Sequence, residues 1–268
     1  MEDTNKSNLV FKDIKVLLIN LDRAEKRYEQ MVAQFKEKEI EFEKISAVDG
    51  KNYQYTNKEF NKRLFMMCEG KKENPAEIGC YLSHYFAIER FLKTDKKFCI
   101  IFEDDAIIND DFKDIVKELV DNSNSWDFVK FNTSRDSGFG NIKVMSLLND
   151  KYKMVASLFP KHLSAAYIIN RKAAESFYKK LLPMFCTYDH EFVKFWKYNM
   201  KQYSIFPSPI TVPWNDSFIY SAECKKFPFY KRATVLFYRV LTQLSRTIFF
   251  YKLFNCNSSR FYKWSKVL

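Results

Sequence analysis

Three consecutive carboxylates, Glu103, Asp104 and Asp105, follow an apolar run in the stretch FCIIFEDDAII, residues 98–108. Ionised carboxylates are costly to place beside a buried strand unless a partner neutralises them. Their hard oxygens suit Mg²⁺ or Mn²⁺, which proteins commonly hold through one or two carboxylates and the phosphates of a substrate. The triplet therefore predicts a site for a divalent cation and a diphosphate. The alternative is an exposed acidic turn that points into water or caps the next helix.

Polar residues also follow the first apolar run of the chain, residues 14–19, where Asn20, Asp22, Arg23 and Arg27 lie close together in sequence. Arg23 and Arg27 are four residues apart, so on a helix they would share one side. Arginines at this position could bind a base, a ribose or a diphosphate. The alternative is an ordinary charged helix start with Asp22 as its N-cap.

The apolar periodicity predicts the elements that must position these residues. Strands are expected at 14–19, 42–48, 97–102, 126–131 and 164–170, and helices at 22–40, 76–93, 111–121 and 171–182. Irregular structure is expected at 51–75 and 183–223, and a loop with a weak hairpin at 133–153. The strand–helix–strand order at the start favours a parallel sheet with helical crossovers. Ligands of such sheets bind outside the carboxyl ends of the strands, where the triplet is predicted to lie.

The chain has 268 residues and a net charge of +11, which is unevenly distributed. Residues 224–268 carry ten Lys or Arg and no Asp or Glu, which leaves 34 basic and 33 acidic residues in 1–223. We therefore divide the chain into a domain at 1–223 and a basic tail at 224–268. A tail of this charge indicates an anionic partner, and no recognition module for nucleic acid is evident.

The tail also has the pattern of an amphipathic helix. Arg232, Arg239 and Arg246 recur every seven residues and would share one helical face. The apolar residues of another face are Phe237, Leu241, Leu244, Ile248 and Tyr251. This pattern predicts binding in the plane of an anionic membrane without spanning it, because charges interrupt every apolar run. The alternative is a helix that packs on the rest of the chain or forms an oligomer contact.

The cysteines and the N-terminal residues indicate the cellular compartment. The six cysteines form no CxxC pair and no zinc-like spacing, and several lie in apolar runs. The first ten residues, MEDTNKSNLV, are polar and lack the core of a signal peptide. Both features favour a reduced, cytoplasmic protein.

Six blocks of the sequence, in this order and at these separations, resemble glycosyltransferase family 25, the lipopolysaccharide and lipooligosaccharide galactosyltransferases and their relatives. The blocks are VLLINLDRAEKRYEQM, ISAVDG, EIGCYLSHYFAIERF, FCIIFEDDAII, SAAYIINRKAAESF and YDHEF, between residue 14 and about residue 192. The resemblance implies an α/β fold of the GT-A type with a mixed, mainly parallel sheet. It also implies a nucleotide-sugar donor, usually UDP-galactose, and an acidic motif that binds Mn²⁺ or Mg²⁺.

Roles for individual residues follow from the resemblance. Asp105 would bind the cation directly, Asp104 would contact the ribose or the water shell of the cation, and Glu103 would support them. The other residues that the family pattern places near the donor are Asn20, Asp22, Arg23, Arg27, Ala47, Asp49, Gly50, Ser83 and His84. The alternatives are turn chemistry at Asp49 and a structural role for His84, since a lone His on a helix is more often structural.

Asp189, His190 and Glu191 form a second polar cluster in the block YDHEF. The family inverts the anomeric centre of an α-linked donor, and an inverting transferase needs one carboxylate base to take the proton of the acceptor hydroxyl. Asp189 is the first choice for this base and Glu191 the second, while His190 is a candidate second metal ligand. The alternative is that Asp189 caps a helix beginning at His190. The resemblance also places His162 and Tyr167 near the site.

The sequence thus predicts a metal-dependent transferase that moves galactose from UDP-galactose to a terminal sugar of lipooligosaccharide. Because the acceptor of this family is a lipid-linked oligosaccharide, the protein would lie on the inner membrane of a Gram-negative bacterium through its basic tail. The alternatives are UDP-glucose or another nucleotide sugar as the donor, a nucleotidyltransferase with a similar acidic site, and a non-enzymatic basic scaffold on a membrane.

Overall fold

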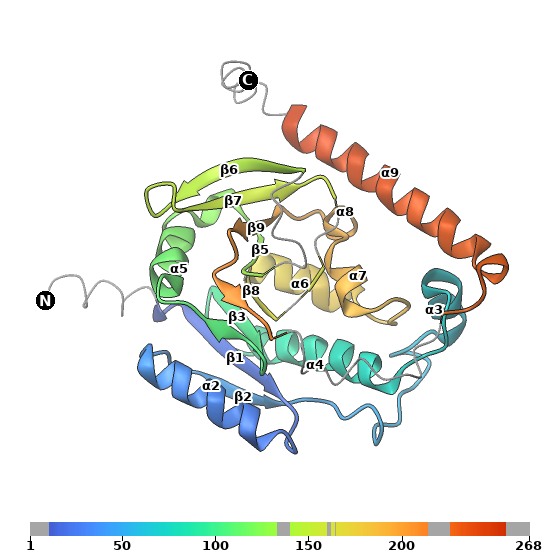
Figure 1. Cartoon of the computed structure of the whole chain (residues 1–268), viewed down its shortest axis with the longest axis horizontal. Helices are drawn as coiled ribbons and strands as arrows, with labels where there is room; N and C mark the ends of the chain where they lie inside the picture. The colour runs from blue at the N-terminus through green and yellow to red at the C-terminus, as the bar shows by residue number, and fades with distance from the viewer. Residues whose placement is uncertain (1–10, 133–139, 160–161, 164, 214–225, 256–268) are drawn as a thin grey trace, which may run out of the picture.

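The computed structural model describes residues 11–132, 140–159, 162–163, 165–213 and 226–255 (Figure 1). The strands are β1 (Ile14–Asn20), β2 (Glu43–Ser46), β3 (Phe98–Glu103), β4 (Ile107–Ile108), β5 (Phe128–Lys130), β6 (Asn141–Leu147), β7 (Tyr152–Ser157), β8 (Ala166–Asn170), β9 (Gln202–Phe206) and β10 (Ile210–Thr211). The helices are α2 (Glu25–Glu37), α3 (Lys62–Glu69), α4 (Pro75–Leu92), α5 (Phe112–Asp121), α6 (Arg171–Lys180), α7 (Tyr188–Phe192), α8 (Phe195–Tyr198) and α9 (Ala233–Asn255). Two short 3₁₀ turns lie at Ser123–Ser125 and Phe229–Lys231.

The central sheet has the strand order β2-β1-β3-β8-β5-β9-β7-β6. Strands β2, β1 and β3 are parallel, and the near-continuous apolar sequences of β1 and β3 match their burial on both faces of the sheet. β8 runs antiparallel to its two neighbours, β3 and β5, while β5 and β9 pair in parallel. The prediction of an α/β fold with a mixed sheet is therefore confirmed.

The pairing register brings three strand ends to one edge of the sheet. Ile19 of β1 lies opposite Glu103 of β3, so β1 and β3 end together. Because β8 runs in the reverse direction, its first residues lie at the same edge, and Lys130 at the end of β5 lies opposite Tyr167. The ends of β1, β3 and β5 consequently meet where the acidic triplet follows β3.

Helices cover both faces of the sheet (Figure 1). One apolar core includes Met31 and Phe35 of α2 with the buried side of α5, and it packs against the alternate residues of β1 and β3. The opposite core is formed by the buried faces of α4, α6 and α7. Gly50 lies where the loop after β2 approaches α4, and a Cβ there would come within 1.8 Å of the Pro75 carbonyl oxygen. Only glycine fits this close approach.

The two segments predicted to be irregular contain regular elements. Within 51–75, α3 begins where the Asn61 side chain accepts a hydrogen bond from the Leu64 amide, and it ends at Gly70 with φ +65°. Within 183–223, the structure has α7, α8, β9 and β10. The hairpin expected at 133–153 is present as β6 and β7 but extends to Ser157, and residues 133–139 lie outside the described part.

Helix α9 packs along α3 and α8 (Figure 1). The tail thus contains a helix that packs on the rest of the chain, as one of the two alternatives predicted. Val235, Arg246 and Phe250 are buried, whereas Arg239, seven residues before Arg246 on the same helix, is exposed. Arg232 precedes the helix. The remaining parts of the predicted tail, 224–225 and 256–268, lie outside the described residues. Of the helices described, none combines the length and the apolar character that crossing a membrane would require.

Candidate active site

Asp104, in the middle of the acidic triplet, is neutralised by residues of the β1–α2 segment. The Asn20 side-chain amide donates to Asp104 Oδ2 at 2.8 Å, and Arg27 donates to Asp104 Oδ1 at 3.0 Å. Asn20 is buried at the end of β1, and Arg27 and Asp104 are both mostly buried. These contacts join the ends of β1 and β3 and fix the turn that carries the triplet. Both Asp104 oxygens are thereby engaged in protein contacts.

Asp105 has the features of a cation ligand. Its Oδ1 atom is buried and has no hydrogen-bond partner among the described residues. Burial and the nearby Glu103 carboxylate raise the pKa of Asp105 to about 7, although Arg27 opposes this shift. A divalent cation would supply the missing partner and offset the repulsion between the two carboxylates. The donor set of this turn therefore fits Mn²⁺ or Mg²⁺.

Glu103 is held by a chain of buried aromatic side chains. His84 of α4 lies with Nε2 3.0 Å from Glu103 Oε1 and Nδ1 3.0 Å from the Tyr167 hydroxyl. The His84 ring stacks on Tyr188 at 4.0 Å between centroids, and the two tyrosine hydroxyls are 3.0 Å apart. Both ring nitrogens of His84 are thus occupied, so this residue orients Glu103 from within the core.

A possible ligand set also includes the Cys80 thiol, which together with His84 and Glu103 has donor atoms within 4.8 Å of one another. Burial raises the pKa of Cys80 well above its usual value, which keeps the sulfur protonated. A sulfur and imidazole set suits softer metals than Mn²⁺ or Mg²⁺. The hard-cation position is therefore on the Asp105 side of Glu103.

The second predicted cluster lies on α7, whose N-cap is Thr187, so the expectation that Asp189 caps a helix from His190 is wrong. His190 Nδ1 is 2.7 Å from Glu69 Oε1, and Glu69 also accepts from the Thr187 amide at 3.2 Å. The ring of His162 lies 5.0 Å from that of His190. Burial, together with the nearby His190 and Lys130, lowers the pKa of His162 to about 4, so this imidazole is neutral at pH 7.

Lys130 connects the two clusters and was missed by the sequence reasoning. It lies at the end of β5 with 1% of its surface exposed. Burial lowers the pKa of Lys130 to about 8, and the opposing influences come from Asp189 and Glu103. Lys130 is thus under the electrostatic influence of both carboxylates. His84, which contacts Glu103 and stacks on Tyr188, joins α7 to the triplet. A lysine inside an otherwise apolar strand was the signal that could have identified it.

Glu191 is adjacent to this cluster in sequence but occupies a different environment. Lys194 donates to its carboxylate at 2.6 Å, and Lys197, the Tyr198 hydroxyl and the Cys186 thiol also contact it. Burial alone would raise the pKa of Glu191, but Lys194 and Lys197 outweigh it and lower the pKa to about 2. The carboxylate is 1% exposed, and its two oxygens are satisfied by protein groups.

The remaining predicted donor residues lie on the loops beside the edge formed by β1 and β2. Arg23 forms an ion pair with Asp49, and both are partly exposed. Asp22 instead accepts from Lys44 and Ser46 on its other side, and the N-cap of α2 is Ala24 rather than Asp22. The structure therefore brings Arg23 and Asp49 together and leaves Asp22 apart.

The loop after β2 is tied to neighbouring elements through its backbone. The Ala47 amide donates to the Asn20 carbonyl at 2.9 Å, and the Val48 amide donates to Ser83 Oγ at 2.8 Å. Ser83 is buried and also donates to the Gly79 carbonyl at 2.7 Å. These contacts give Ser83 a structural role that connects α4 with the loop carrying Asp49.

Comparison with known proteins identifies the family. The model of glycosyltransferase family 25, described as LPS biosynthesis protein, matches residues 13–192. Human procollagen galactosyltransferase 2 is 29% identical over 115 residues, which are 40% of this chain and 18% of that protein. A glycosyltransferase 25 family member of Aedes aegypti is 28% identical over 130 residues, 45% of this chain and 21% of that protein.

The similarities extend to a protein described as inactive and to a solved structure. A probable inactive glycosyltransferase 25 family member 3 of Rattus norvegicus is 28% identical over 127 residues, 43% of this chain and 22% of that protein. The crystal structure of A197 from STIV aligns with a TM-score of 0.40 and 12% identity, covering 73% of this chain and 83% of that chain. This chain matches about a fifth of the length of its curated relatives. The match to the family model over most of the chain shows that the protein belongs to glycosyltransferase family 25.

Proposed function

We propose that the protein transfers a hexose, galactose from UDP-galactose, to a terminal sugar of lipooligosaccharide or lipopolysaccharide with inversion at the anomeric carbon. The observation that carries the proposal is that His84 joins Glu103 of the triplet to Tyr188 of α7, the helix of Asp189, in a member of this family. UDP-glucose or another nucleotide sugar is the alternative donor. Galactose is favoured because a relative is named a procollagen galactosyltransferase.

The donor would bind across the ends of β1 and β3 of a GT-A-like domain formed by residues 1–223. Asp105 is the proposed cation ligand, with Glu103 beside it. Asp104 fixes the turn through Asn20 and Arg27, and it stays the proposed contact to the ribose or to the water shell of the cation. When bound, Mn²⁺ or Mg²⁺ would offset the negative charge that develops on the departing diphosphate.

The outer part of the nucleotide would lie on the exposed loops. Arg23 and Asp49 are the proposed contacts for the base and ribose, because they are partly exposed and face each other at the mouth of the sheet. Ala47 and Gly50 shape this loop through their backbone. His84 would act indirectly, because it orients Glu103 and does not contact the donor itself.

Asp189 is the proposed general base. The acceptor hydroxyl oxygen forms a bond to the anomeric carbon while the bond from that carbon to the UDP oxygen breaks, and the hydroxyl proton moves to Asp189. The negative charge of Asp189 in turn raises the pKa of Lys130 and so opposes the effect of burial on that lysine. Glu191 is the weaker candidate because Lys194 and Lys197 occupy its carboxylate. His190, held by Glu69, is the proposed orienting neighbour of Asp189 and remains an alternative metal ligand.

A thermal-shift panel tests the donor and cation together. We expect UDP-galactose with Mn²⁺ to raise the melting temperature more than UDP-glucose or UDP-N-acetylglucosamine, and EDTA to remove the difference. Release of UDP from the donor supports the transferase, whereas release of pyrophosphate from a nucleoside triphosphate supports the nucleotidyltransferase alternative. A protein that binds neither a nucleotide sugar nor a nucleoside triphosphate with either cation would contradict both enzymes and favour the scaffold.

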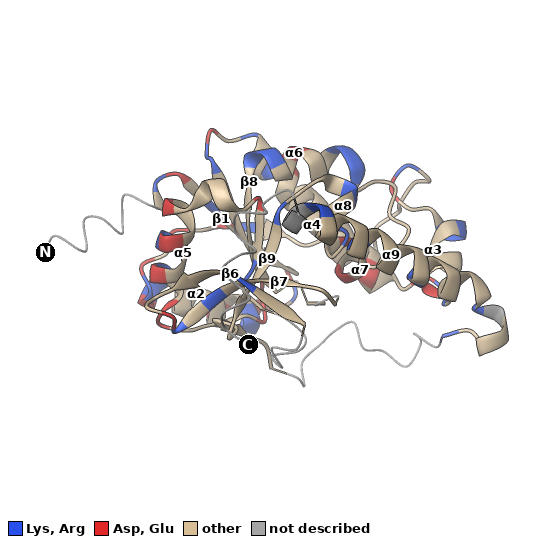
Figure 2. Cartoon of the chain, turned by 90° about the horizontal axis from the view of Figure 1, so that it is seen from above, with Lys and Arg blue, Asp and Glu red and all other residues tan. Residues whose placement is uncertain are grey.

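We also propose that α9 holds the enzyme on an anionic membrane surface, where a lipid-linked acceptor would be found. Figure 2 draws α9 largely in the colour of uncharged residues. Its large exposed apolar residues are Leu236, Phe237, Val240, Leu241, Leu244, Ile248 and Tyr251. An apolar helical row of this length beside exposed cations such as Arg239 is typical of helices that lie in the membrane interface.

Vesicle flotation tests this attachment. The variant Leu241→Ser/Leu244→Ser should recover less protein with vesicles containing anionic phospholipid, and Ile107→Ser, an exposed apolar position on β4, should float like the wild type. Equal recovery of the α9 variant and the wild type contradicts the proposal. A loss of dimer mass in the α9 variant without any vesicle binding by the wild type would instead assign the face to a second copy of the chain.

A further inference from the structure

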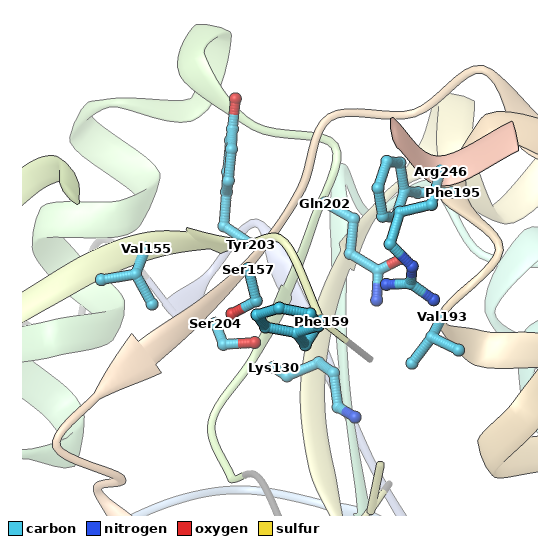
Figure 3. Close-up of a pocket in the computed structure, with 10 residues that line it drawn as sticks. All are labelled: Lys130, Val155, Ser157, Phe159, Val193, Phe195, Gln202, Tyr203, Ser204 and Arg246. Carbon is cyan, nitrogen blue, oxygen red and sulfur yellow. The ribbon is translucent and has the colours of Figure 1, made fainter. Parts of the chain in front are cut away.

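A small, partly open pocket lies between the β5–β9–β7 part of the sheet and helix α9 (Figure 3). Its polar side chains come from Lys130, Ser157, Gln202, Ser204 and Arg246. Lys130 and Ser204 are paired residues of neighbouring strands, and Val155 pairs with Ser204 from the other side. The pocket therefore extends from Lys130 at the end of β5 to Arg246 on α9.

Arg246 brings a buried positive charge to this pocket from outside the sheet. Its guanidinium lies over the rings of Phe195 and Trp196, 5.6 and 5.1 Å from their centroids, and the residue is 3% exposed. Its Nε atom is buried without a hydrogen-bond partner among the described residues. Burial lowers the pKa of Arg246 to about 10, and no carboxylate of the described residues contributes to that shift. A buried guanidinium without a carboxylate partner among the described residues would be stabilised by an anion bound next to it.

The walls of the pocket suit a small anionic group attached to a sugar. Lys130 contributes a second buried cation, and Gln202 presents a buried side-chain oxygen that has no partner among the described residues. Because amide oxygen and nitrogen are assigned from the local contacts, the Gln202 amide can rotate to donate to an anion. Phe159, which is partly exposed, provides an apolar wall. The pocket is partly open to solvent, so an anionic group on a larger saccharide would reach these side chains from outside.

We propose that the pocket binds an anionic group, a carboxylate or a phosphate, on the acceptor saccharide, with Arg246 as its principal contact. The proposal rests on the proposed function, since Lys130, which lines the pocket, is under the electrostatic influence of Asp189, the proposed base. The donor diphosphate would lie at the ends of β1 and β3. The pocket at Arg246 would therefore be available to the acceptor. α9 would then complete the acceptor site of the catalytic domain, and specificity would depend on the charge of the acceptor.

Binding to the whole chain without donor tests the pocket independently of catalysis. The probes are glucuronate, glucose-6-phosphate and glucose, measured by isothermal titration calorimetry on the wild type, Arg246→Gln and the matched control Arg239→Gln. We expect the anionic sugars to bind the wild type more tightly than glucose. Arg246→Gln should weaken that binding about 10- to 100-fold, the range of one lost charge-assisted hydrogen bond. Arg239 is exposed on the same helix, so its variant should bind like the wild type.

Preference for glucuronate or for glucose-6-phosphate identifies the source of the anionic group. Equal binding of all three sugars, or wild-type affinity in Arg246→Gln, would overturn the proposal. Gln202→Met serves as a second variant if Arg246→Gln does not fold, and it should weaken anion binding while leaving the melting temperature near that of the wild type. If transfer is measured, Arg246→Gln should raise KM for a charged acceptor and leave kcat unchanged with a neutral one. Binding that persists without transfer would refute the proposed function and keep the pocket.

Discussion

Asp105 and Glu191 are both buried carboxylates near the same sheet edge, and their environments are opposite. Asp105 has a like-charged neighbour in Glu103 and an oxygen without a partner, and its pKa is raised to about 7. Glu191 is surrounded by Lys194, Lys197 and Tyr198, and its pKa is lowered to about 2. A protein that folds to maximal stability would satisfy both groups. The contrast indicates that Glu191 maintains the fold, whereas Asp105 is left unsatisfied for a cation.

The largest expected effect is on the proposed base. Asp189→Asn removes the acceptor of the hydroxyl proton while keeping the size of the side chain, so transfer should fall about 100-fold or more. Binding of the nucleotide sugar should remain within a few-fold of the wild type, because Asp189 is not a proposed donor contact. Rates of UDP release with acceptor and a titration with UDP-galactose measure the two quantities. Wild-type transfer by this variant would return the role of base to Glu191 or to another group.

The next prediction concerns Asp105, whose neutral variant should have a higher melting temperature than the wild type, whereas that of Glu191 should have a lower one. Asp105→Asn should reduce cation-dependent transfer about 100-fold, yet it removes the repulsion with Glu103. Because the folded pKa of Asp105 is raised, ionising this group costs stability as the pH rises from its ordinary pKa of 3.8 through about 7. In EDTA at pH 8, we therefore expect Asp105→Asn to melt at a higher temperature than the wild type.

Asp110→Asn is the matched control for Asp105→Asn, because the Asp110 side chain is almost fully exposed. It should change neither transfer nor melting temperature. A lower melting temperature of Asp105→Asn in EDTA would show that the turn needs this carboxylate for folding. Full metal-dependent transfer in the variant would remove Asp105 from the cation site.

The sequence predicts the two carboxylate clusters, but it does not predict which carboxylates face the site and which stabilise the fold. The triplet was recognisable because an uninterrupted apolar run places its last residues at a strand end, and Asn20 could be placed at the same edge by the same argument. Asp189 and Glu191 are two residues apart, and such positions on a helix do not face the same direction. Which of them faces the site depends on the lysines of α8, whose segment gave no clear apolar period.

The roles of Lys130 and Glu69 could not be predicted from the sequence, because they depend on tertiary structure. Lys130 reaches the site because β8 reverses the sheet between β3 and β5, and a single strand sequence does not state its neighbours. Glu69 lies at the end of α3, whose Asn61 and Gly70 are ordinary helix boundary signals in a segment too short and polar for a clear period. The tail was predicted to be amphipathic, but the sequence could not show that Arg246 turns inward while the apolar row faces out.

A smaller effect, confined to stability, is expected at Glu191. Glu191→Gln leaves Lys194 buried without its counter-charge, which costs about 3 kcal/mol and lowers the melting temperature by roughly 6–12 °C in a chain of this size. Transfer by the protein that remains folded should stay near the wild-type rate. Differential scanning calorimetry and a transfer assay below the transition measure both. Asp13→Asn, which breaks a surface ion pair with Lys97, is the control and should leave the melting temperature close to that of the wild type.

The smallest and most specific effect is the pH dependence of the difference in melting temperature between the wild type and Glu191→Gln. Because the folded pKa of Glu191 is lowered from 4.5 to about 2, its contribution to stability is fully present above pH 4.5 and is lost as the pH falls toward 2. The melting temperatures of the wild type and Glu191→Gln should therefore differ most at pH 6 and converge between pH 4.5 and 2. Melting curves at half-unit intervals check this convergence. A difference that stays constant over the interval would mean that the variant loses packing around Tyr198 and Cys186 rather than the ion pairs, and the contrast with Asp105 would then no longer be electrostatic.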